Sequence, residues 1–105
     1  MDEREFNLQA DAMLARIETA LEGSGADLDF EIKPGGVIEI EFDNGSKIIV
    51  NRHTAAREIW VAARSGGYHF KPDAGRWVAA RDGAELMATL SRCVSEQAGA
   101  PVGLG

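Results

Sequence analysis

The chain has 105 residues, of which 45% are hydrophobic, and a formal net charge of −6 at pH 7. A chain of this length forms one domain with a single core and is too small to enclose a deep active site between two lobes, so we expect surface chemistry. The acidic balance argues against a nucleic acid partner, because phosphate binding requires clustered lysines and arginines.

Two further features indicate where the chain works. No apolar run approaches the roughly 20 residues that cross a bilayer, and the first residues lack the basic and apolar regions of a signal peptide. The lone cysteine, Cys93, cannot form an internal disulfide, which suits a reducing compartment. We therefore expect a soluble, cytoplasmic protein with no membrane partner.

The acidic residues are concentrated at the start of the chain. The first 31 residues contain nine acids and two arginines, a net charge of −7, whereas the other 74 contain eight acids and nine basic residues, a net charge of +1. Such a cluster binds cations, docks a basic partner, or is a solvated face that maintains solubility. The residue pattern alone leaves these three interpretations open.

The first predicted element is an amphipathic helix over Glu3–Glu22. Apolar residues recur there at intervals of three and four, the period of one helix face. They are Phe6, Ala10, Met13, Leu14, Ile17 and Leu21. At about 100° per residue, Asp11, Glu18 and Glu22 form one stripe beside the apolar face, on the flank where the helix would meet a sheet.

After residue 26 the period changes to two, which predicts two half-buried strands joined by a turn at residues 34–36. The apolar positions of these strands are Leu28, Phe30, Ile32, Ile38, Ile40 and Phe42. The acids that alternate with them in the first strand are Asp27, Asp29 and Glu31.

The loop after the second strand fixes the register of the next pairing. A two-residue loop would place Lys47 on the buried face. A three-residue loop that ends at Gly45, with this glycine left-handed in a bulge, instead pairs Ile40 with Ile48 and Glu41 with Lys47. We predict this bulged hairpin.

A later strand sets the orientation of a tryptophan. The segment Arg57–Arg64 is expected to bury Ile59, Val61 and Ala63, since the opposite parity would bury charged side chains without partners. Trp60 must then face outward. Two shorter strands are expected around residues 68–71 and 76–81, joined by a turn at 72–75, and the pattern does not decide the facing of Trp77.

The chain closes with a second helix. Asp82, followed three residues later by Glu85, predicts a capping box at its start. Its apolar stripe contains Leu86, Leu90, Cys93 and Val94. Gly99 ends the helix, and residues 100–105 are expected to form a flexible tail.

The order of helix, about six strands and helix, with short links throughout, predicts an α+β fold. In this two-layer sandwich both helices pack on one face of an antiparallel sheet, and the other face is open to solvent. Residues 1–99 would form the single domain, with Asn51 and Trp60 on the open face.

Five stretches match the motifs of one family in the same order along the chain. They are Glu5-Phe6, Ala10-Asp11, Asn44 to Arg52, Ile59 to Ala62 and Gly66 to Phe70. With these stretches the chain resembles the frataxin family, specifically its bacterial branch, from about residue 5 to residue 99. The resemblance implies the same helix, antiparallel sheet and helix sandwich.

The resemblance also implies a role in iron–sulfur cluster assembly. Frataxins bind ferrous and ferric iron weakly through acids of the first helix and first strand. They dock onto the cysteine desulfurase and scaffold proteins, which they regulate or supply with iron. Carried over by position, this acidic ridge consists of Asp11, Glu18, Glu22, Asp27, Asp29 and Glu31. The partner-binding residues are Asn51, Arg52 and Trp60.

Side-chain chemistry predicts weak metal binding. Carboxylates are hard oxygen donors that suit ferric iron, and the acidic ridge has no histidine or cysteine at ligand spacing. Alternate residues of a strand lie about 7 Å apart, too far to chelate one ion together. We therefore expect several exposed sites with labile iron and no organic cofactor. His53 and His69 are expected to be structural or exposed.

Two alternatives remain. The chain could be an acidic interaction module that is steered to a basic partner, with incidental metal binding. It could also oxidise iron and store it in oligomers. The sequence suggests no Ser-His-Asp or Cys-His arrangement, so we expect no enzyme activity. We expect a monomer, and iron-dependent oligomers under the storage alternative.

Overall fold

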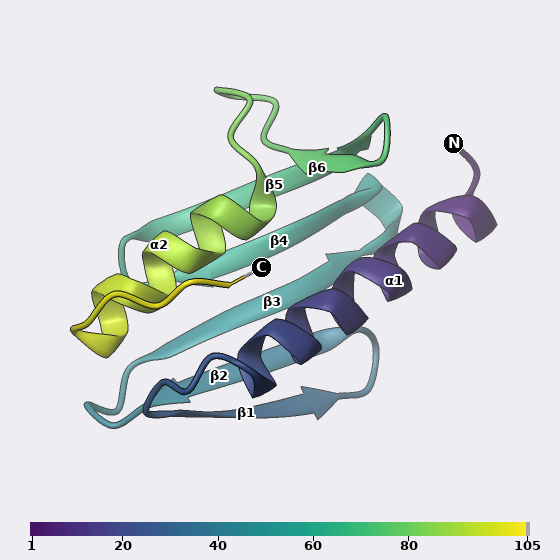
Figure 1. Cartoon of the computed structure of the whole chain (residues 1–105). Helices are drawn as coiled ribbons and strands as arrows, with labels where there is room; N and C mark the ends of the chain where they lie inside the picture. Colours follow the sequence, from purple (N-terminus) through teal and green to yellow (C-terminus); the bar gives the residue numbers. More distant parts are fainter. Residues whose placement is uncertain (105) are drawn as a thin grey trace.

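The computed structural model describes residues 1–104, which contain two helices and six strands (Figure 1). The elements are α1 (Glu3–Glu22), β1 (Leu28–Lys33), β2 (Val37–Phe42), β3 (Lys47–His53), β4 (Glu58–Ala63), β5 (Gly66–Asp73), β6 (Arg76–Val78) and α2 (Leu86–Ala98), with a short 3-10 helix, η1 (Thr54–Ala56), after β3. The strands form one antiparallel sheet in sequence order. Both helices cover the same face of this sheet, so the predicted α+β two-layer sandwich is confirmed.

The core lies between the two helices and the sheet. Alternate residues of the central strands point into it and are at most 1% exposed. They are Ile38, Ile40, Ile48, Val50, Ile59 and Val61. Because successive strand residues face opposite sides, the residues between them lie on the open face of the sheet.

Helix α1 has the predicted bounds, Glu3–Glu22. It begins at Asp2, whose carboxylate accepts a hydrogen bond from the backbone N–H of Glu5 at 2.8 Å. Its apolar stripe from Phe6 to Leu21 is buried against the sheet. This packing, rather than intrinsic propensity, supplies most of the stability of a helix in a folded protein.

The bulged hairpin between β2 and β3 is confirmed. Gly45 has φ 84°, and its N–H donates to the carbonyl of Phe42 at 2.9 Å. Ile40 pairs with Ile48, and Glu41 pairs with Lys47. The left-handed glycine therefore holds the register that buries both isoleucines.

Strand β6 is shorter than predicted, because it ends at Val78 rather than near residue 81. The N–H of Ala79 donates to the carbonyl of Ala84 at 2.9 Å, and the carbonyl of Ala79 accepts from Gly83 at 2.8 Å. These bonds turn the chain away from the sheet. The turn before β6 is also tighter than predicted: Asp73 pairs with Arg76, which leaves a loop of only two residues.

The facing of Trp77, which the sequence left open, is inward. The side chain is 7% exposed and belongs to the core. Its ring meets that of Phe6 edge-on, with 5.9 Å between centroids. This contact joins the start of α1 to the sheet edge at β6.

The predicted capping box at Asp82 and Glu85 is wrong. Helix α2 has Glu85 itself as its N-cap residue, and no side-chain hydrogen bond caps it. Asp82 instead accepts from the N–H of Ala84 at 3.0 Å within the preceding loop. An aspartate that bonds to a backbone two residues ahead stabilises a turn, and this local bond competes with capping. The predicted helix end at Gly99 is confirmed, with φ 73°.

The chain after α2 lies back along that helix (Figure 1). The Ser95 hydroxyl donates to the carbonyl of Val102 at 3.1 Å and accepts from its N–H at 2.9 Å. Ser91 bonds in the same way to Leu104, which is 8% exposed and packs into the core. The flexibility predicted for residues 100–105 stays a prediction, and these contacts would restrict the described part of the tail.

Candidate functional site

The structure divides the predicted acidic ridge between two surfaces. Asp11, Glu18 and Glu22 lie on α1, and Glu18 is half-buried while the other two are exposed. Asp11 and Glu18 line a shallow hollow of about 220 Å³ between the helix and the edge of the sheet. Lys33 also lines this hollow, but its ammonium group is bonded to Glu39 on the open face of the sheet.

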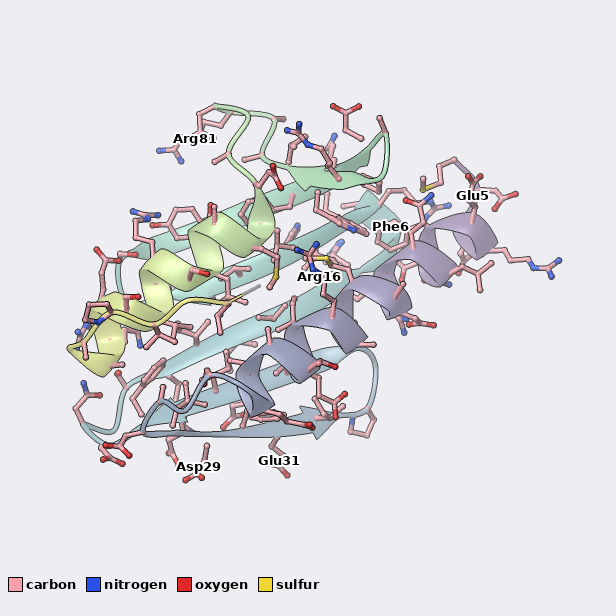
Figure 2. The ribbon with its side chains drawn as sticks, viewed as in Figure 1. Glu5, Phe6, Arg16, Asp29, Glu31 and Arg81 are labelled. Atoms are coloured by element: carbon pink, nitrogen blue, oxygen red, sulfur yellow. The ribbon has the colours of Figure 1, made fainter. Side chains whose placement is uncertain are left out.

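The strand carboxylates lie on the other side of the edge strand. Asp29 and Glu31 alternate with residues that point toward the helices, so their side chains lie on the open face of the sheet. Figure 2 shows both projecting away from the molecule along β1. Asp27 is exposed in the loop before this strand. Strand β1 therefore separates the helix acids from the strand acids.

No preformed metal cage exists in the part of the chain that the structure describes. Across residues 1–104 there is no group of three His, Cys, Asp or Glu side chains that could hold a metal ion. The carboxylates of the ridge can act as separate hard-cation ligands, each completed by water.

Paired lysines neutralise another carboxylate of the open face. Glu39 receives hydrogen bonds from Lys33 at 2.6 Å and from Lys47 at 2.9 Å. These bonds, with Lys33 the larger cause, lower the pKa of the Glu39 carboxyl to about 2. Both lysine pKa values are raised by the same bonds. The surplus negative charge of this face therefore lies toward β1.

Trp60 lies on the open face between two histidine rings. The His53 ring is stacked at 4.0 Å from the Trp60 ring centroid, and the His69 ring at 4.3 Å, each tilted by 10°. The indole N–H donates to Glu58 at 2.8 Å. The predicted outward orientation of Trp60 is confirmed, and its ring is held in one place by partners on three strands.

Asn51 is the direct cross-strand neighbour of Trp60. Arg52 follows it in the strand and so points to the opposite side of the sheet, where its guanidinium donates to Asp11 of α1. Arg52 therefore does not share the open face with Trp60, and its role in partner binding stays a prediction.

Sequence reasoning missed the part that Glu58, His53 and His69 play around Trp60. Strand parity could have found them, since Trp60 pairs with His69, and His53 pairs with Glu58 beside it. The missing information was the register between β4 and β5. The two loop residues between these strands, Arg64 and Ser65, do not fix that register from sequence alone.

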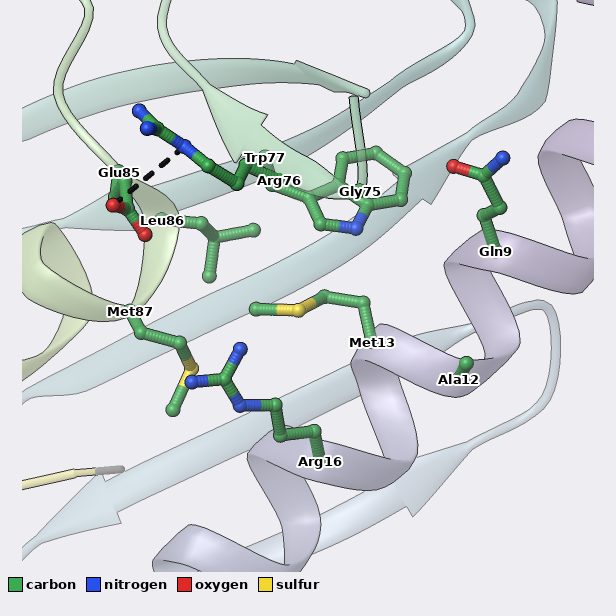
Figure 3. Close-up of a pocket in the computed structure, with 10 residues that line it drawn as sticks. All are labelled: Gln9, Ala12, Met13, Arg16, Gly75, Arg76, Trp77, Glu85, Leu86 and Met87. Carbon is green, nitrogen blue, oxygen red and sulfur yellow. Dashed lines mark ion pairs between the residues drawn. The ribbon is translucent and has the colours of Figure 1, made fainter. Parts of the chain in front are cut away.

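A further hollow lies between α1, α2 and β6 (Figure 3). It measures about 290 Å³ and is lined by apolar side chains that include Met13, Trp77 and Met87. Arg76 and Glu85 form an ion pair of 3.7 Å at its rim. None of the predicted site residues lines this hollow.

No helix in residues 1–104 is long and apolar enough to cross a membrane.

The fold and these surfaces define a class of protein: a small α+β sandwich with an acidic margin and an aromatic residue on an otherwise open sheet. A model of the frataxin-like domain matches residues 1–100. The chain belongs to the frataxin family, as its sequence motifs predicted.

Individual relatives agree with this assignment. The iron-sulfur cluster assembly protein CyaY of Dechloromonas aromatica is 62% identical over 99 residues, which cover 94% of each chain. The frataxin structure from Psychromonas ingrahamii has a TM-score of 0.89 at 32% identity and covers 98% of this chain and 97% of that one. A trimeric yeast frataxin from Saccharomyces cerevisiae, complexed with ferrous iron, has a TM-score of 0.66 at 26% identity over 94% and 88% of the two chains.

Proposed function

We propose that this chain acts in iron–sulfur cluster assembly as a non-enzymatic iron-binding protein of the cytoplasm. It binds ferrous or ferric iron weakly through the acidic ridge. It docks onto a complex of cysteine desulfurase and scaffold protein, and so regulates cluster formation or supplies its iron. The names of its bacterial relatives support the role in assembly, and the yeast complex with ferrous iron supports the choice of metal.

The observation that carries the proposal is the concentration of acids at one margin of the sheet. The helix contributes Glu18 and Glu22, on the side of the sheet that the helices cover. Strand β1 contributes Asp29 and Glu31, whose side chains lie on the open face. Exposed carboxylates without a chelating arrangement favour loose binding and rapid exchange. A donor or a sensor needs both properties, because its ion must leave.

The two docking elements have different chemistry. Trp60 is a large aromatic side chain on an open sheet, and such residues often dominate the binding energy of protein interfaces. The acidic ridge would steer the chain toward a basic surface and raise the association rate. We therefore expect Trp60 and Asn51 to control dissociation from the scaffold and desulfurase, and the ridge to control association.

The alternative of a pure interaction module is favoured by one observation. The carboxylate of Asp11 is already paired with Arg52, and so one predicted metal ligand has a protein counterion. Under this alternative, the acidic side chains of the ridge bind the partner protein, and metal binding is incidental.

Binding kinetics with the purified desulfurase and scaffold separate the two functions. The double variant Glu18→Gln, Glu22→Gln should slow association and weaken anaerobic ferrous iron binding. The double variant Asp73→Asn, Glu96→Gln removes two exposed acids elsewhere and serves as the charge-matched control. If the Glu18→Gln, Glu22→Gln variant lost partner binding in the presence of a metal chelator but kept its affinity for iron, the interaction module would be favoured. Growth into large particles with loss of ferrous iron in air would favour storage.

A further inference from the structure

The early end of β6 leaves part of strand β5 without a neighbour. Strand β5 runs from Gly66 to Asp73, but β6 pairs only with its last three residues, Lys71 to Asp73. The chain then turns away at Ala79. The place beside residues 66–70, which a longer β6 would have filled, is therefore open.

The backbone groups that face this place can be assigned from the hairpin. Asp73 and Arg76 close a two-residue loop and form a hydrogen-bonded pair, so the N–H and C=O of Asp73 point toward β6. Alternate residues repeat this orientation, which directs the backbone groups of His69 and Gly67 outward. Within residues 1–104, no turn, loop or cap hydrogen bond uses them.

A groove runs along this free edge. It measures about 580 Å³ and is bounded by β5, by the loop after β6 and by α2. Gly67 and His69 line one wall, and a Cβ placed on Gly67 would meet no atom within 4 Å. The groove therefore has room for an extended backbone next to the strand.

Two arginines give the groove a positive wall. Arg81 and Arg92 both line it, both are exposed, and neither forms an ion pair in the described chain, residues 1–104. Arg81 projects from the loop in Figure 2. Arg92 lies over the ring of Tyr68, 5.5 Å from its centroid. In a chain of net charge −6, such unpaired cations are available to an outside anion.

The two carboxylates that line the groove are already engaged. Glu58 accepts from Trp60 at 2.8 Å and lies 3.9 Å from Lys71. Asp82 accepts from the backbone of Ala84 at 3.0 Å. Neither shields the arginines by a direct ion pair.

We infer that this groove is a docking site for an extended acidic peptide segment of a partner protein, which adds as a strand to the free edge of β5. The outward N–H and C=O groups of Gly67 and His69 bind the peptide backbone, and Arg81 and Arg92 bind its carboxylates. The groove adjoins the Trp60 face, because His69 belongs to both. A partner on the open sheet could therefore insert such a segment.

The probe is a blocked hexapeptide of alternating valine and glutamate, titrated into the isotope-labelled full chain at low salt and followed by amide NMR shifts. We expect saturable shifts at Gly67 and His69 that become at least tenfold weaker in affinity at high salt. The matched peptide with lysine in place of glutamate should produce none. Shifts confined to other strands, or equal shifts with both peptides, would overturn the inference.

Two kinds of variant separate backbone pairing from charge. Gly67→Pro removes an outward N–H and should reduce affinity at least tenfold. Arg81→Gln with Arg92→Gln should do the same without a change in melting temperature, whereas Arg4→Gln with Arg16→Gln, both exposed on α1, should leave binding within twofold. Full binding by the Arg81 and Arg92 variant would overturn the inference, and so would complete competition by inorganic phosphate, which would indicate a free-anion site.

Discussion

The guanidinium of Arg52 donates a hydrogen bond to the carboxylate of Asp11 and thereby joins strand β3 to helix α1. Both residues were predicted as functional, one for a partner and one for metal. Their side chains are 21% and 65% exposed, so the pair is screened by water and contributes only about 0–1 kcal/mol to stability. Its main consequence is that Asp11 carries its own counterion.

Asp11→Asn should therefore change metal binding less than Glu18→Gln does. We expect a loss of less than about 1 kcal/mol in the free energy of unfolding, measured by urea denaturation, and nearly unchanged ferrous iron affinity in anaerobic calorimetry. Glu18→Gln should weaken that affinity more. If Asp11→Asn instead abolished iron binding, the ion pair would have to open to form the site.

The two tryptophans should respond oppositely to truncation. Trp60→Ala removes a half-buried ring from the open face, so the variant should fold with a small decrease in melting temperature and lose affinity for the desulfurase and scaffold. Trp77→Ala removes a ring that is 7% exposed and should cost about 3–5 kcal/mol. Thermal denaturation of both variants is the check. A larger loss for Trp60 would show that its stack with His53 and His69 is structural.

Acid stability should depend on Glu39. Its hydrogen bonds to Lys33 and Lys47 lower its carboxyl pKa from 4.5 to about 2. A carboxyl with a lowered pKa stabilises the folded state above pH 4.5, and this contribution is lost as the pH falls toward 2. The difference in unfolding free energy between the wild type and Glu39→Gln should therefore shrink across this range.

Urea denaturation at stepped pH measures this difference, and Glu41→Gln is the matched control. The carboxylate of Glu41 lies 4.0 Å from Lys47, too far for a hydrogen bond of normal length. If the stability difference between the wild type and Glu39→Gln persisted unchanged at pH 2, the lowered pKa assigned to Glu39 would be contradicted. So would an equal pH-dependent effect of Glu41→Gln.

The tail after α2 should contribute to stability. Removal of residues 101–105 exposes the surface that Leu104 covers and leaves the hydroxyls of Ser91 and Ser95 without their tail partners. We expect a loss of about 1–3 kcal/mol, visible as a lower melting temperature. Leu104→Ala should reproduce much of it. An unchanged melting temperature would mean that the tail is mobile in solution, as its sequence predicted.

The sequence predicts those features that depend on local periodicity. The bounds of α1, the bulge at Gly45 and the outward face of Trp60 all follow from which parity or helix face can be buried. The fold class follows from the order of these elements. Strand parity also places Arg52 on the helix side of the sheet, opposite to Asn51 and Trp60.

Other features depend on contacts between distant segments and could not be predicted. The ion pair of Asp11 with Arg52 spans 41 positions, and the packing of Leu104 requires a surface that only the folded helices create. The early end of β6 depends on the bonds of Ala79 in the loop that follows. The division of the acidic ridge by β1 became visible only with the sheet assembled.

The central claim is that the acidic ridge acts in iron–sulfur cluster assembly. The most direct measurement follows anaerobic cluster formation on the scaffold with cysteine desulfurase and ferrous iron, in the presence of the wild type, the Glu18→Gln, Glu22→Gln variant or the Asp73→Asn, Glu96→Gln control. We predict that the wild type and the control change the rate of cluster formation equally and that the ridge variant changes it much less. An unaltered rate with the wild type, or an equal effect of the ridge variant, would contradict the claim.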